Sequence, residues 1–196
     1  NYVSPSSGSG VLSVTSTSTF TEGIATITDE TFSDCGIITI TATYADDSTK
    51  KGTSNPIDFR PYNFTVVASG LDTAASGSDY ARHTVSKPFT LTITARNASG
   101  KTCPNYKGTA TLTDSTAQSD SLGTSSLTST YWTNGVATLT SQTYKKWGRI
   151  TITATDETLK NQTGTSANIT FIPKDFLIIL SEPPKSRTFY YKDEQF

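Results

Sequence analysis

The chain has few of the residues that build catalytic or metal sites. Its 196 residues include no methionine, a single histidine, and two cysteines that lie 68 positions apart without a CxxC motif. A zinc site or a Ser-His-acid relay would have to be built around His83, which lies in a predicted loop. A surface or packing histidine is the simpler interpretation. No GxSxG, HExxH, Walker or GxGxxG string occurs, so we expect neither an enzyme nor a bound cofactor.

The chain also lacks long runs of like-charged residues and long runs of apolar residues. The formal net charge is −1, and no run of like charges exceeds two or three residues. The chain therefore lacks the electrostatic footprint of a protein that binds nucleic acid or an anionic membrane. No apolar run approaches the ~18 residues of a membrane-spanning helix, and NYVSPSSGSG at the start does not resemble a signal peptide. We expect any export signal or anchor to lie outside these residues.

Short stretches of alternating apolar and polar residues make up much of the rest. Gly23–Thr28, Ile37–Tyr44 and Pro88–Arg96 alternate with a period of two, which is typical of half-buried strands, and Pro88–Arg96 is the best candidate for a central strand. The polar stretch Ala45–Gly52 is predicted to be a turn. Abundant Thr, Val, Ile and aromatic residues favour strands, and no helical period occurs. These patterns predict an all-β chain folded as two-sheet antiparallel sandwiches of immunoglobulin type.

An internal repeat organises the chain. Gly135–Thr155 repeats Gly23–Thr43 at an offset of 112 residues, and twelve of the 21 paired positions are identical. This period equals the size of one ordinary sandwich domain. The match continues without a gap as far as Phe64 and Phe176, which places the unit boundaries near residues 61 and 173.

The repeat therefore predicts three units. Residues 1–60 are the C-terminal half of an immunoglobulin-like repeat, residues 61–172 are a complete repeat, and residues 173–196 begin a third, whose first strand is Phe176–Leu180. We expect the chain to be cut in mid-domain at both ends. A half sandwich exposes unpaired strand edges, so either the rest of a longer polypeptide or a strand from another chain would complete it.

Several strings within these units carry a family resemblance. The repeated GxATxT and GxIxITAT patterns, the FxP before each new unit and LTITARNASGKTCPNYKGTATLT resemble the bacterial immunoglobulin-like repeats of secreted surface proteins, adhesins and invasin-type arrays. The unit entries IDFRPYNFTVV and ITFIPKDFLIIL resemble, more narrowly, the repeats of MshQ-type proteins associated with mannose-sensitive haemagglutinin pili. The resemblance implies a stalk, filament or tip module outside the cell, with no catalytic residues to carry over.

The two cysteines are predicted to face each other at a unit boundary. Cys35 lies in the turn before Ile37–Tyr44, at the end of the first unit that adjoins the second. Cys103 follows a strand that runs opposite to Phe64–Ala68, so it returns to the same boundary. We hypothesise an interdomain disulfide between Cys35 and Cys103, in keeping with an oxidising extracellular setting. A free buried Cys35, or pairing with residues beyond this chain, are the alternatives. The repeat counterpart of Cys35 is Trp147.

Acidic pairs in turns are the candidates for a cation site. Asp46, Asp47, Asp156 and Glu157 lie in predicted turns and offer the carboxylate oxygens that calcium prefers. Solvated turn residues are the simpler interpretation.

Aromatic residues are the candidates for a contact surface. Tyr131, Trp132 and Trp147 would form one if they were exposed together, whereas core and junction packing is the alternative. We expect a structural role at the cell surface, as a stalk or filament segment whose partners are neighbouring repeats or a pilus assembly. The second candidate function is an adhesin module that binds a glycan or a host protein through its tip loops.

Overall fold

The structure, a computed structural model, describes residues 1–14, 19–77, 80–117 and 119–176. The described chain is all-β, and its single helical element is a 3₁₀ turn, η1 (Ser129–Tyr131). No helix within the described ranges is long and apolar enough to cross a membrane. Apart from Phe176, the predicted strand Phe176–Leu180 lies outside the described residues.

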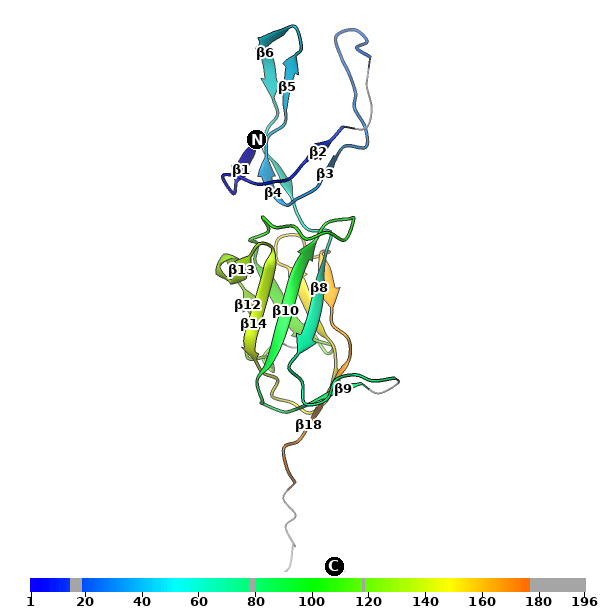
Figure 1. Ribbon diagram of the computed structural model, residues 1–196, viewed down its shortest axis with the longest axis vertical. Helices are drawn as coiled ribbons and strands as arrows, with labels where there is room; N and C mark the ends of the chain where they lie inside the picture. The colour runs from blue at the N-terminus through cyan, green and yellow to red at the C-terminus, as the bar shows by residue number, and fades with distance from the viewer. Residues whose placement is uncertain (15–18, 78–79, 118, 177–196) are drawn as a thin grey trace, which may run out of the picture.

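Residues 1–60 are called here the first unit, and their described part contains seven short strands. They are β1 (Tyr2–Ser4), β2 (Leu12–Ser13), β3 (Thr31–Phe32), β4 (Gly36–Ile38), β5 (Thr41–Tyr44), β6 (Asp47–Thr53) and β7 (Ile57–Phe59). They form a three-stranded sheet, β1-β4-β7, and the pairs β2-β3 and β5-β6. Figure 1 shows β5 and β6 projecting as a hairpin at the end of the molecule away from the second unit.

Residues 61–172, called here the second unit, contain two four-stranded sheets. One has the order β13-β14-β10-β8 and the other β12-β11-β16-β17. Their strands are β8 (Asn63–Ser69), β10 (Phe89–Arg96), β11 (Ala110–Asp114), β12 (Ser126–Leu127), β13 (Trp132–Thr133), β14 (Val136–Gln142), β16 (Ile152–Asp156) and β17 (Thr163–Thr165). Buried residues of both sheets form one apolar core, an arrangement consistent with a β-sandwich.

The predicted central strand is confirmed. β10 pairs antiparallel with β8 on one side and with β14 on the other. Its alternate residues Phe89, Leu91, Ile93 and Ala95 are all buried, because side chains at every second position of a strand point to the same face. Sequence periodicity therefore identified both the strand and the face that it buries.

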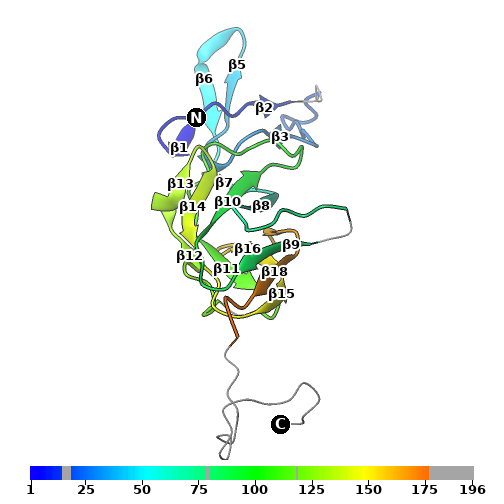
Figure 2. The ribbon, with the colours of Figure 1, turned by 60° about the horizontal axis from the view of Figure 1, so that its bottom comes forward.

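A third sheet of the second unit departs from the purely antiparallel prediction. It consists of β15 (Gly148–Ile150), β18 (Ile169–Ile172) and β9 (Ala81–Thr84), which lie together in Figure 2. β9 and β18 run parallel, with His83 opposite Phe171. His83 therefore lies on a strand and not in a loop. The four residues of β9 show little alternation, and their partner strand lies far along the chain, so the sequence pattern did not indicate a strand there.

The first unit corrects three sequence predictions. Ala45–Gly52 is not a turn throughout, because Asp47–Thr53 forms β6 and pairs with β5. Ile37–Tyr44 is divided between β4 and β5, which belong to different sheets. Gly23–Thr28 forms no strand and contributes an isolated bridge between Thr21 and Ile24. The counterpart of Gly23–Thr28 in the second unit lies in β14, which pairs with β10 and β13; within the described residues, Gly23–Thr28 has no such neighbours.

The repeat seen in the sequence is also a repeat of strand register. In β4–β7, Gly36 faces Phe59, and in β15–β18, Gly148 faces Phe171, so adding 112 to each partner of the first pair gives the second. The hairpins β5–β6 and β16–β17 are related by the same shift. One difference separates them: β16 also pairs with β11, whereas β5 pairs with β6 alone among the described residues.

Candidate functional site

A network of polar contacts centred on Asp34 joins the first unit to the second. The Asp34 side chain is 4% exposed and follows β3, at the end of the first unit that faces residues 103–106. Its Oδ2 accepts a 2.9 Å hydrogen bond from Asn105 Nδ2, and its Oδ1 accepts a 3.3 Å bond from the Asn105 backbone. Asn97 Nδ2 adds a 2.9 Å bond to the carbonyl of Ser33. Hydrogen bonds from side chains and backbone of the second unit therefore hold this end of the first unit in place.

The same carboxylate also organises the first unit. Asp34 Oδ1 accepts a 2.7 Å hydrogen bond from the backbone N–H of Cys35, and Oδ2 accepts a 3.2 Å bond from the Tyr2 hydroxyl. The Tyr2 oxygen in turn accepts a bond from Gly10 N. A buried carboxylate is stable when donors surround it, so Asp34 connects the N-terminal residues, the Cys35 turn and Asn105 in one network.

The structure brings Cys35 and Cys103 together. Both side chains are buried in the same apolar cluster, at 1% and 0% exposure. Both are free thiols in the structure, and the predicted disulfide stays a prediction. Interaction with the Cys103 side chain and burial away from water raise the pKa of the Cys35 thiol above its ordinary value, because both favour the neutral form.

The loop that carries Cys103 is held rigidly against the second unit. The Cys103 N–H donates to the carbonyl of Ala95, and the Cys103 carbonyl accepts from the N–H of Tyr106, at 2.9 and 3.1 Å. Gly135, with φ of +73°, passes so close that a Cβ there would lie 2.1 Å from the Cys103 carbonyl oxygen. The close approach and the positive φ both require glycine at this position.

A cleft of about 170 Å³ opens at the junction. Residues of both units line it, among them Cys35, Arg60, Asn105 and Tyr106. Arg60 Nε donates a 2.8 Å bond to Asp58 Oδ2 beside it. The cleft therefore lies beside the cysteine pair, on the side of Cys35.

No family model, curated protein or solved structure matches the chain. The functional argument therefore rests on the residues and contacts themselves.

The three predicted contact aromatics do not lie together on the surface. Trp132 is 3% exposed, and its ring lies 4.6 Å from that of Tyr106 in an edge-on contact and 5.8 Å from that of Phe64. Tyr131 is 40% exposed and Trp147 is 77% exposed. Trp132 pairs with Ala137 near the start of β14, whereas Trp147 follows the end of that strand. Trp132 thus belongs to the core, and Tyr131 and Trp147 are the exposed members of the set.

Two of the four predicted acidic residues, Asp47 and Asp156, have hydrogen-bond partners within the protein. Asp156 is fully buried, and its Oδ1 accepts bonds from the backbone N–H of Thr158 and Leu159. Asp47 Oδ1 accepts from Thr49. No group of three or more His, Cys, Asp or Glu that could hold a metal ion occurs among the residues that the structure describes. Calcium binding at Asp46, Asp47, Asp156 or Glu157 stays a prediction.

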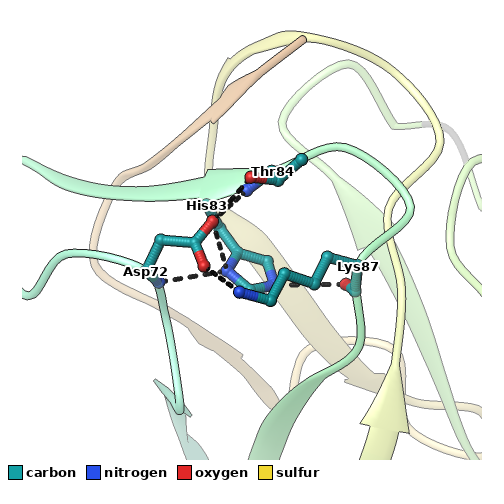
Figure 3. A network of polar contacts seen from close by, with 4 residues as sticks. All are labelled: Asp72, His83, Thr84 and Lys87. Atoms are coloured by element: carbon teal, nitrogen blue, oxygen red, sulfur yellow. Dashed lines mark hydrogen bonds and ion pairs between the residues drawn. The ribbon is translucent and has the colours of Figure 1, made fainter. Parts of the chain in front are cut away.

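His83 serves the packing of the second unit. Figure 3 shows it among Asp72, Thr84 and Lys87. His83 is fully buried, Nδ1 accepts a 3.2 Å bond from the Asp72 backbone N–H, and Nε2 lies 3.1 Å from the Lys87 carbonyl oxygen. Nε2 therefore carries the hydrogen and donates a hydrogen bond to the carbonyl oxygen of Lys87. Because both ring nitrogens form hydrogen bonds with backbone groups, the His83 imidazole connects the segments that contain Asp72 and Lys87 to β9.

The Asp72 carboxylate closes this network on the surface. It accepts bonds from the Lys87 ammonium and from the Thr84 hydroxyl and backbone N–H. These contacts, with the Lys87 bond first, lower the pKa of Asp72 well below its ordinary range, because each stabilises the charged form. The arrangement fixes the segment around Asp72 against β9 and Lys87.

Sequence reasoning located the cysteines but missed the polar residues around them. Asp34 and Asn105 lie 71 positions apart, and no periodicity relates them. The available signal was divergence between the repeats, because Ser33-Asp34-Cys35 aligns with Lys145-Lys146-Trp147. In the first unit this divergent stretch lies where that unit meets the second.

Proposed function

We propose that the chain is a structural segment of a bacterial extracellular surface or filament protein, in which tandem immunoglobulin-like units act as a stalk. The observation that carries this proposal is the 112-residue shift that relates the strand registers of the two units. Details of hydrogen bonding follow the same shift: Thr41 Oγ1 lies 3.1 Å from Thr53 Oγ1, and Thr153 Oγ1 lies 2.9 Å from Thr165 Oγ1. Repeated units that contact their neighbours are a common way to build an extended scaffold.

The path of the chain supports a spacing role. In Figure 1 the first unit lies at one end of the long axis and β18 leads out at the other. Polar contacts between Asp34 and Asn105 hold the junction between them. Two units placed in succession along one axis and joined by hydrogen bonds suit a spacing role.

The test of this role is the rigidity of the junction. Residual dipolar couplings measured on the intact chain are expected to fit a single alignment tensor for the described parts of both units. The variant Asn105→Ala removes the side-chain bond to Asp34 and is expected to give two distinct tensors, while Asn55→Ala, in an exposed stretch between β6 and β7, leaves one. Two independent tensors in the unaltered chain would contradict a spacing role.

The extracellular location has its own test. An antiserum raised against the folded chain is expected to label intact cells of the source organism, or to detect the protein in the medium. Labelling that requires permeabilised cells would reject the proposed location, whatever the junction does.

A second candidate function is binding of a glycan or a host protein, and exposed aromatic residues favour it. Trp147 and Tyr131 are 77% and 40% exposed, and aromatic rings stack on sugar faces and on protein surfaces. A glycan array and a panel of host-matrix proteins probed with the labelled chain test this function. Binding that Trp147→Ala abolishes while Asn55→Ala preserves it would establish an adhesin; no binding above that of a non-adhesive β-protein would reject it.

A further inference from the structure

We propose that Cys35 and Cys103 are an oxidisable pair that locks the two units by a disulfide, with Cys35 as the thiol that meets the oxidant and Cys103 as the thiol that resolves the bond. Two geometric observations carry this inference: both side chains are buried in one cluster, and Asp34, next to Cys35, accepts hydrogen bonds from Asn105, two residues after Cys103. It deepens the proposed stalk function, on which its mechanical purpose rests; its chemistry does not depend on that function.

Neither thiol has another partner of its kind. The sequence contains two cysteines with 67 residues between them, and the fold places one from each unit in the same buried cluster. The backbone of each is held by hydrogen bonds, Cys35 N to Asp34 Oδ1 and Cys103 N to the Ala95 carbonyl. Hydrogen bonds therefore position the backbones of both cysteines at the junction, and disulfide geometry requires their Cα atoms to lie about 4.4–6.8 Å apart.

The two sulfurs differ in their access to solvent. Cys35 lines the junction cleft of about 170 Å³ together with Arg60 and Asn105. Among the described residues, Cys103 does not line the cleft, and it is 0% exposed. A small disulfide that enters the cleft therefore reaches Cys35 first. The thiolate is the form that attacks a disulfide, and because the pKa of the Cys35 thiol is raised, the reaction is expected to be faster at alkaline pH.

The reaction balances with a disulfide of low molecular mass, such as glutathione disulfide, as the oxidant. The Cys35 thiolate attacks one sulfur, forms a mixed disulfide and releases one glutathione thiolate, which takes up the proton that Cys35 lost. The Cys103 thiolate then attacks the Cys35 sulfur, and the second glutathione leaves with the proton of Cys103. Two electrons pass from the protein sulfurs to the oxidant, and one disulfide replaces another.

The cross-link would change how the chain bears force. A disulfide between Cys35 and Cys103 shields the 67 residues between them from extension when the chain is pulled from its ends. An unfolded chain spans about 3.3–3.6 Å per residue, so the oxidised chain is expected to extend roughly 220 Å less than the reduced one in single-molecule pulling. The double variant C35S/C103S serves as the control and is expected to extend like the reduced chain under both conditions.

The direct test treats the intact folded chain with glutathione disulfide and then with an alkylating reagent in denaturant. The expected product has lost two hydrogen atoms, takes up no alkyl group, and yields a Cys35–Cys103 peptide in a non-reducing digest. If both thiols of the chain are still alkylated under conditions that fully oxidise a control dithiol peptide, the proposed disulfide is overturned.

Single variants test the separate roles. In Cys103→Ser, Cys35 has no resolving partner and is expected to accumulate as the glutathione mixed disulfide. In Cys35→Ser, Cys103 is expected to stay unmodified under native conditions and to react once urea unfolds the chain. Amide spectra of both variants verify folding of the second unit. Faster modification of Cys103 than of Cys35 would overturn the assigned roles. If the disulfide forms although the two units show independent alignment tensors, the stalk function is rejected. The proposed disulfide between Cys35 and Cys103 then still stands.

Discussion

The hydroxyl of Tyr106 donates a 2.6 Å hydrogen bond to Asp156 Oδ2 inside the second unit. Both residues are buried, at 2% and 0% exposure. Tyr106 lies three positions after Cys103, and Asp156 ends β16, so the bond ties the junction loop to the sheet behind it. Burial and the bond to Asp156 raise the pKa of the Tyr106 hydroxyl, which keeps it protonated and able to donate.

Removal of this hydroxyl is expected to destabilise the second unit. In Tyr106→Phe, Asp156 keeps its two backbone donors but loses its side-chain donor, and a hydrogen bond to a charged group contributes about 1.5–3 kcal/mol. Urea unfolding followed by circular dichroism measures the change. The control is Tyr62→Phe, because Tyr62 is 66% exposed. Equal effects of the two substitutions would contradict the role of the buried bond.

Two glycines at the same repeat position are expected to respond in opposite ways to alanine. A Cβ at Gly164 would lie 1.9 Å from the carbonyl oxygen of Phe64, whereas a Cβ at Gly52 would meet nothing within 4 Å. Gly164→Ala is therefore expected to cost about 1–3 kcal/mol or more by overpacking. Gly52→Ala is expected to leave its hairpin unchanged or more stable by about 0.5–1 kcal/mol. Amide hydrogen exchange in the β16–β17 and β5–β6 hairpins measures each effect locally, and loss of protection in both would refute the packing argument.

The two tryptophans are expected to differ in energetic importance. Trp132 packs in the core, so Trp132→Ala is expected to lower the free energy of unfolding by about 3–5 kcal/mol. Trp147 is 77% exposed, and Trp147→Ala is expected to change the free energy of unfolding by no more than about 0.5 kcal/mol. Iodide quenching provides an independent check: it should quench emission in the unaltered chain and leave the Trp147→Ala variant, which retains Trp132, nearly unquenched.

The second unit is expected to lose stability at alkaline pH. Burial, followed by the hydrogen bond to Asp114, raises the pKa of Tyr144 from 10.0 to about 12. Between these values the unfolded chain releases a proton that the folded chain retains, so the free energy of unfolding falls as pH rises through this window. Below pH 10 the contribution is fully present.

Thermal unfolding measured from pH 8 upward tests this titration. The melting temperature is expected to be level until about pH 10, the ordinary tyrosine pKa, and to fall beyond it. Tyr144→Phe should fall less steeply, with the remaining slope due to Tyr106 and other groups. Identical profiles for the variant and the unaltered chain would mean that Tyr144 does not contribute.

Local pattern was informative where one strand lies between two neighbours. The alternation of residues 88–96 predicted β10 and its buried face, because a strand with both edges paired and one face in a core has to alternate. The boundaries of β4, β5 and β6 were not predictable in the same way. Thr41–Tyr44 and most of β6 are exposed on both faces, so no alternation distinguishes strand from turn there.

Long-range pairing was beyond the reach of sequence patterns. β9 was missed because its parallel partner β18 lies far along the chain, and four residues carry too little alternation to identify a strand. Asp34 and Asn105 were missed because a polar residue in a loop looks the same whether it faces water or another unit. Their importance depends on the partner that the fold brings to them.

The sequence by itself determined the repeat and the strand character of the chain, because hydrophobic periodicity and an internal copy specify local conformation and register. The tertiary structure decided which side chains are buried. It placed Trp132 in the core and Trp147 in solvent, both ring nitrogens of His83 on backbone partners, and the Asp34 carboxylate among donors from two units. Burial and hydrogen-bond partners depend on what packs around a residue, and that is a property of the whole fold.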